Sequence, residues 1–180
     1  ALSGHDGLWI SIERRGLFCG TKFVNAPFTT TAGGTTSADF TGDPTDPSGS
    51  EAEVFYAYYP YSAHAVLEGS VVSGLSIPAV QTFVTKSFAT ELCPMATSGA
   101  DYSRLAFRTI GTVLKFQVTG QKNVTKIELT GNNGEALAGD YTIDFVGETP
   151  EMKFSGTETT LTLTCSEPVA LNDASATEFF

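Results

Sequence analysis

The sequence of this 180-residue chain predicts an all-β fold, and three observations support that prediction. Apolar residues recur at every second position in one segment after another, which is the period of a half-buried strand. Thr, Ser and Gly are abundant, whereas charged residues make up only 17% of the chain. Gly, Pro and Asn, which favour turns, separate the short apolar runs. We therefore expect two packed antiparallel sheets or a barrel, and a single β-sandwich domain over residues 1–180 is the simplest arrangement.

Four strands are expected in the first half of the chain, at residues 8–13, 35–41, 53–59 and 75–81. Pro78 interrupts the last of them, and because proline removes a backbone donor, we expect an edge or bulged strand there. Residues 41–53 are rich in Gly, Pro, Asp and Ser and predict a loop. Only residues 81–92 have an apolar spacing that supports a short helix.

The second half of the chain shows the clearest alternation. Residues 113–120 and 159–166 place apolar side chains on one face and polar ones on the other, which predicts antiparallel strands with one solvated face. Residues 125–131 and 140–145 alternate in the same way. The segment between them contains Asn-Asn-Gly at 132–134, and because Asn and Gly tolerate positive φ, we expect a hairpin or meander there.

Residues 53–65, EVFYAYYPYSAHA, hold the densest group of aromatic side chains. On a strand, alternate residues face opposite ways, and here both faces are apolar or amphipathic. This is typical of a central sandwich strand, which Pro60 should end. Tyrosine also forms carbohydrate platforms, because its ring offers a flat apolar face beside a hydroxyl. Core packing is therefore the first interpretation, and ligand binding at Tyr56 and Tyr58 is the second.

Charge and motifs exclude several classes of function. Twenty acidic against ten basic residues give a net charge of −10, so nucleic acid or an anionic membrane surface would repel the chain. No apolar run approaches the ~20 residues that span a bilayer. The sequence has no HExxH motif and no Gly-x-Ser-x-Gly elbow. We therefore expect no catalytic residues, no metal and no cofactor, and we do not expect an enzyme.

The residue types that bind metals are few and scattered. The three cysteines, Cys19, Cys93 and Cys165, have no CxxC spacing, so they predict neither a zinc nor a redox site and allow at most one internal disulfide. Cys165 continues an alternating apolar row, which favours a buried thiol. His5 and His64 are expected in exposed loops.

An acidic loop is the best candidate for calcium, since that ion takes several carboxylate oxygens. Its spacing fits no EF-hand, so a solvated loop without metal is the first expectation. The carboxylates concerned are Asp39, Asp43, Asp46, Glu51 and Glu53.

Several segments stand in a characteristic order along the chain: GHDGLWISI (4–12), ADFTG (38–42), EVFYAYYPYSA (53–63), GLSIPAVQT (74–82), LCPMATS (92–98), FRTIGTVLKFQVTG (107–120) and VTKIELTGNNGEALAGDYTID (124–144). In this order they resemble the fimbrillin-like surface proteins of Bacteroidales. The match covers nearly the whole chain, and no single motif carries it.

The resemblance implies an exported protein of two transthyretin-like β-sandwich domains, of which this chain would be the N-terminal one. Such proteins are subunits or tip components of surface fimbriae, and a lipid anchor on the precursor holds them to the outer membrane. They bind other fimbrial subunits when a strand donated by one fills a groove in the next, and they contribute to adhesion. A module that binds carbohydrate or a host ligand without polymerising is the alternative.

The chain departs from the family pattern in two respects. It carries no lipoprotein signal, and it ends at Phe180, where a family member would continue into a second sandwich. We expect it to be one domain of a longer protein. The pair Arg14-Arg15 is a candidate site for an arginine-specific protease, although such a pair is more often a solvated face.

Overall fold

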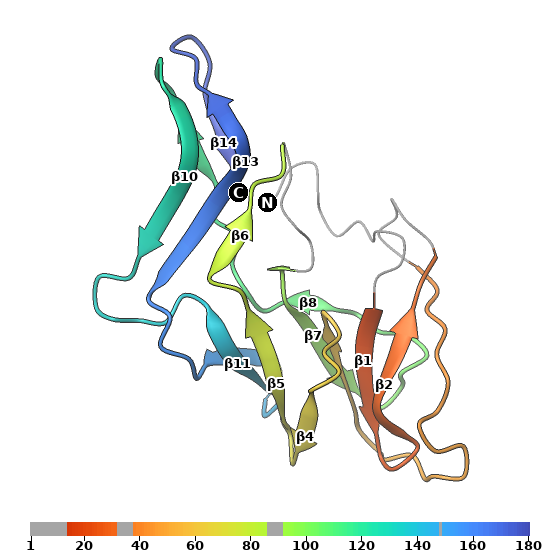
Figure 1. Ribbon diagram of the computed structural model, residues 1–180. Coiled ribbons are helices and arrows are strands. Elements are labelled where there is room, and N and C mark those ends of the chain that lie inside the picture. The colour runs from red at the N-terminus through yellow and green to blue at the C-terminus, as the bar shows by residue number, and fades with distance from the viewer. Residues whose placement is uncertain (1–13, 32–37, 86–91, 148) are drawn as a thin grey trace. The chain divides into compact units, whose positions relative to one another are not determined.

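The computed structural model describes residues 14–31, 38–85, 92–147 and 149–180. These residues form strands without an α-helix (Figure 1), which confirms the predicted all-β class. The strands make one five-stranded, one four-stranded, one three-stranded and one two-stranded sheet.

The chain forms two compact units from interleaved segments. Unit 1 contains Ala1–Leu75, Pro94–Gly111 and Ile143–Met152, and unit 2 contains Ser76–Cys93, Thr112–Thr142 and Lys153–Phe180. Because each unit draws on both halves of the sequence, no single cut in the chain separates them. A single domain over residues 1–180 stays a prediction.

Unit 1 contains the five-stranded sheet, whose order is β2-β1-β3-β7-β8 and whose pairs are all antiparallel. Its strands are β1 (Arg14–Cys19), β2 (Phe23–Thr29), β3 (Phe55–Tyr59), β7 (Met95–Gly99) and β8 (Arg108–Thr109). The aromatic segment is thus a central strand that ends directly before Pro60, as its two apolar faces predict.

Both faces of this sheet are packed. On one face, β1, β2 and β3 form a buried cluster of Leu17, Cys19, Phe23, Ala26, Phe55 and Ala57. On the other face, Tyr58 stacks on Phe18 with ring centroids 6.2 Å apart, and Tyr56 contacts Phe145 at 5.0 Å. Burying one large apolar side chain is worth about 1.5–3 kcal/mol, so this two-sided packing is the main source of stability for unit 1.

Unit 2 contains the three-stranded sheet β10-β13-β6 and the two-stranded sheet β14-β9. β10 pairs with β13 antiparallel, β13 with β6 parallel, and β14 with β9 antiparallel. Their bounds are β6 (Val80–Thr82), β9 (Phe116–Val118), β10 (Asn123–Thr130), β13 (Thr160–Ala170) and β14 (Thr177–Phe179). The parallel pair departs from the purely antiparallel arrangement that the sequence predicts.

The four-stranded sheet has the order β12-β11-β5-β4. Its strands are β4 (Val66–Glu68), β5 (Val71–Ile77), β11 (Gly139–Asp144) and β12 (Glu151–Phe154). β4 and β5 form a hairpin whose turn contains Gly69 at a φ of 62°.

The expected hairpin between residues 125–131 and 140–145 is wrong. These segments form β10 and β11, which lie in different sheets. β10 pairs instead with β13, where Leu129 lies opposite Leu161 and Ile127 opposite Leu163. Apolar cross-strand pairs stabilise a sheet more than nearness in sequence does, and they decide the pairing here.

Three other expectations need correction or fall outside the described residues. The strand expected at 75–81 is two strands, because Pro78 separates β5 from β6. The helix expected at 81–92 is wrong for residues 81–85, where β6 continues to Thr82, and residues 86–91 lie outside the described part. Of residues 35–41, those described form only a bridge from Thr41 to Thr29. The strand expected at 8–13 is also outside.

Candidate functional site

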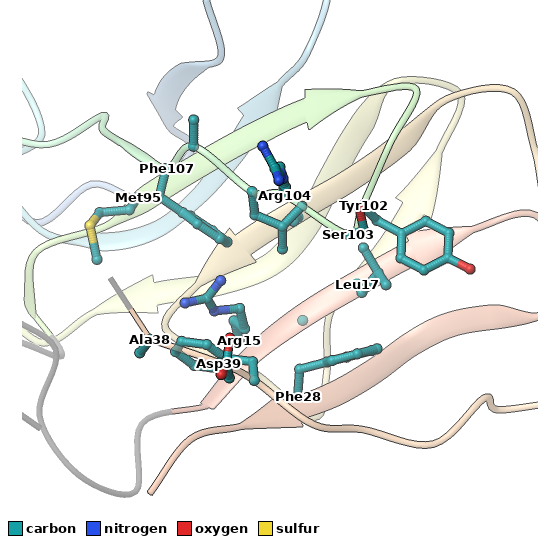
Figure 2. A pocket seen from close by; sticks show the side chains of 15 residues that line it. Arg15, Leu17, Phe28, Ala38, Asp39, Met95, Tyr102, Ser103, Arg104 and Phe107 are labelled. Atoms are coloured by element: carbon teal, nitrogen blue, oxygen red, sulfur yellow. The ribbon is translucent and has the colours of Figure 1, made fainter. Parts of the chain in front are cut away.

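A hollow of about 810 Å³ lies in unit 1 (Figure 2). Strands β1, β2 and β3 line one side of it with Arg15, Leu17, Phe28 and Ala57. Residues 38–40 and 102–107 contribute the remaining side chains, together with Met95. Arg15 and Leu17 face the same way because they are two residues apart on β1.

Arg15 is the most unusual residue of this hollow, since it is only 5% exposed. Its guanidinium carbon lies 3.1 Å from the centroid of the Phe40 ring and 4.4 Å from that of Phe107. A guanidinium between two aromatic faces is held by cation–π attraction, which strengthens when water is excluded. Arg15 therefore joins β1 to two covering segments, 38–40 and 102–107.

The burial of Arg15 corrects one expectation. Arg14 is exposed, but Arg15 is not part of a solvated face. Both residues belong to β1, which pairs with β2 on one side and β3 on the other. An arginine-specific protease would need β1 to open before it could reach the Arg15 carbonyl.

Glu51 connects the acidic loop to the cover of the hollow. Lys22 Nζ lies 2.7 Å from Glu51 Oε1, and the Tyr102 hydroxyl donates to the same oxygen at 2.9 Å. The hydrogen bond from Lys22, followed by that from Tyr102, lowers the pKa of Glu51. The same contacts raise the pKa of Lys22 and of Tyr102. Glu51 therefore stabilises loop closure.

The other calcium candidates do not gather around a common point. Asp46 accepts hydrogen bonds from the hydroxyl and amide of Ser48, which lower its pKa. Among the described residues, which include Asp39, Asp43, Asp46, Glu51 and Glu53, no group of three His, Cys, Asp or Glu side chains could hold a metal ion. The structure supplies no support for calcium in this loop.

The two candidate ligand residues lie mainly in the core. Tyr58 is 0% exposed, and its hydroxyl donates to Asn25 Oδ1 at 2.6 Å and lies 3.0 Å from the Ser62 carbonyl. Tyr56 is half-buried against Phe145. The Tyr58 ring has no exposed face on which a sugar could stack, so ligand binding stays a prediction for Tyr56 alone.

The cysteines and the described histidine have no common site. Cys19 is buried, Cys93 and Cys165 are half-buried, and all three are free thiols. Cys165 is thus less buried than its place in the alternating row predicts, although burial still raises its pKa. His64 is exposed in a turn, as expected, while His5 lies outside the described residues.

An open sheet edge is the main candidate in unit 2. Ala79 accepts a hydrogen bond from Thr162 at 2.7 Å, and Phe83 donates one to Thr164 at 2.8 Å. In a parallel pair, alternate residues bond to the same neighbour, so the N–H and C=O of Val80 and Thr82 point away from β13. No strand among the described residues pairs with that side of β6 (Figure 1).

The sheet to which β6 belongs is also incompletely covered. Leu163 is 6% exposed, but Leu161, Ile127 and Leu129 on the paired strands are only half-buried by the described residues. Half-buried apolar rows beside an open edge can take up a further strand.

The sequence analysis missed both Arg15 as a buried cation and β6 as an open edge. A signal existed for Arg15, because it alternates with Leu17 and Cys19 on a strand and so shares their buried face. For β6, Pro78 marked a strand break, but the partner of Val80 depends on residues 80 positions away.

The described residues include no helix with the length and hydropathy needed to cross a bilayer. Comparisons with protein-family models, with curated proteins and with solved structures found no match to this chain.

Proposed function

We propose that this chain is a subunit or accessory component of a bacterial surface fimbria that joins its neighbours by strand donation and contributes to adhesion. The resemblance to fimbrillin-like proteins suggests the class. The observation that carries the proposal is the open β6 edge beside half-buried apolar rows in unit 2. Two transthyretin-like sheets are the finer fold that this proposal includes.

Strand donation fits the physics of such an edge. A donated strand satisfies the free N–H and C=O groups of β6 and buries apolar side chains at the same time. Several buried side chains at about 1.5–3 kcal/mol each would make dissociation very slow. The proposed location is therefore the cell surface, where a polymer has to survive without any energy supply.

Assembly of the natural protein tests this proposal. We expect the protein purified from the cell envelope to form filaments by electron microscopy and a ladder of heat-stable bands on a denaturing gel. A variant with unchanged secondary structure but without the ladder would locate the joint. If the natural protein stays monomeric under all export and processing conditions, a polymerising role is lost.

The alternative, a module that binds carbohydrate or a host ligand without polymerising, has less support because Tyr58 is buried. A glycan array separates the two proposals. Binding that disappears in Tyr56→Ala, together with no assembly, would favour the ligand module.

A further inference from the structure

We infer that this chain accepts a partner strand at the β6 edge and is closed against one at the β2 edge. The identity of the partner, an extended segment of a second copy, rests on the proposed function. The difference between the two edges rests on their own hydrogen bonds.

Residues 41–45 cover the β2 edge. Thr29 and Thr41 exchange two backbone hydrogen bonds, of 2.8 and 2.9 Å. The Thr45 hydroxyl accepts a hydrogen bond from the Val24 amide at 3.0 Å and donates one to the Val24 carbonyl at 3.1 Å. One hydroxyl thus replaces both groups that a neighbouring strand would supply to Val24.

The middle of the β2 edge is closed in another way. Pro27 has no N–H, and proline in an edge strand prevents addition of a further strand. Gly42 lies directly against the Pro27 carbonyl, since a Cβ added to it would be 2.6 Å from that oxygen. The closure matters because the Val24 side chain is 51% exposed, and an open edge with exposed valine would promote aggregation.

The β6 edge has none of these devices. Val80 and Thr82 present their backbone groups, and the side chains of Val80 and Val84 are 61% and 43% exposed. The opposite edge of the same sheet is protected, because Lys126 and Glu128 form an ion pair of 3.0 Å along β10. Charged side chains on an edge disfavour strand addition, so β6 is the unprotected edge of this sheet.

A second copy is the occupant that suits this edge. The three residues of β6 carry no charge, so the main-chain bonds and apolar contacts of an uncharged alternating segment would complement it. The chain itself contains such segments, of which TTLTLTC at residues 159–165 is an example. A strongly basic partner would gain nothing at β6.

Residue-resolved hydrogen exchange on the full chain tests the inference. The probe is a synthetic peptide of residues 159–165, with Cys165→Ser and lysines added at both ends. We expect it to slow exchange of the Val80 and Thr82 amides at least about tenfold. The Gln81 and Phe83 amides, which face β13, serve as internal controls and should not change, nor should the Val24 amide.

Matched variants sharpen the result. Thr82→Pro removes one edge-facing donor and leaves the bonds to β13, so it should abolish the slowing at Val80, whereas Thr82→Val should retain it. Thr45→Val removes the hydroxyl that closes β2, so the peptide should then also slow the Val24 amide in an otherwise folded chain. Thr45→Ser, which keeps the hydroxyl, should behave as the wild type does.

The outcomes separate this inference from the proposed function. Slowing at Val24 but not at Val80 in the wild type would overturn it, and so would fast Val80 and Thr82 amides in a filament that does form. Filaments with unprotected β6 amides would leave the fimbrial proposal intact. Peptide binding at β6 without any filament would remove the polymer and keep the assignment of the edge.

Discussion

Tyr58 shows how one side chain organises a sheet. Its hydroxyl binds Asn25, which has a φ of 51° at an irregularity between β1 and β2, and it also accepts the Ser62 amide at 3.2 Å. A buried hydroxyl with several partners is stabilising chiefly because its removal leaves those partners unsatisfied. The aromatic segment is therefore held by polar as well as apolar contacts.

Tyr58→Phe should destabilise the protein by about 1–3 kcal/mol, because the Asn25 and Ser62 groups lose a buried partner. Urea denaturation followed by circular dichroism measures the change. Tyr61→Phe is the matched control at a half-buried position outside this network. Equal stability of Tyr58→Phe and wild type would show that the network contributes nothing.

Gly16 is required by the same ring. Gly16 pairs with Tyr58 across β1 and β3, and a Cβ added to Gly16 would lie 2.1 Å from the Tyr58 ring. We expect Gly16→Ala to cost about 1–3 kcal/mol through overpacking. In a Tyr58→Leu background the same substitution should cost less, because contacting residues are not additive. An equal cost in both backgrounds would contradict this explanation.

Glu51 should make stability depend on acid pH. Its pKa is lowered in the folded protein from an ordinary value of 4.5, so the carboxylate stabilises the fold above that pH. The contribution is lost as the pH falls through the lowered pKa. Glu51→Gln should therefore flatten the pH dependence of the melting temperature below about pH 4.5. Glu53→Gln, in the same loop, should leave the profile unchanged.

At the scale of elements, burial distinguishes the strands. β3 pairs on both sides and is packed on both faces, whereas β9 pairs only with β14 among the described strands. Amides in such central strands open only with global unfolding. We expect native-state hydrogen exchange to place β3 among the slowest segments and β9 among the fastest, and comparable rates would contradict the assignment of the core.

Existence of strands was more predictable than their pairing. Residues 53–59 and 159–166 show two-residue alternation, and both lie in strands that the structure contains. The same alternation cannot state a partner, because every half-buried strand offers a similar row. Hence β10 was expected beside β11 but lies beside β13.

At the scale of the whole molecule, net charge should govern association. Two copies that each carry −10 repel one another at low ionic strength, and salt screens that repulsion. If the chain assembles as proposed, the rate of filament growth should rise with sodium chloride concentration between about 0.01 and 0.15 M. Light scattering at matched protein concentration measures the rate, and a fall with salt would indicate attraction between oppositely charged patches.

The sequence by itself determined that this protein is built of strands and that residues 53–59 are apolar on both faces, because side-chain alternation is a local property of the chain. It also determined the excess of acidic charge. Only the tertiary structure decided that Arg15 is buried between Phe40 and Phe107, that β6 pairs with β13, and that Thr45 closes the β2 edge. Each of these depends on contacts between residues far apart in sequence, which no local pattern specifies.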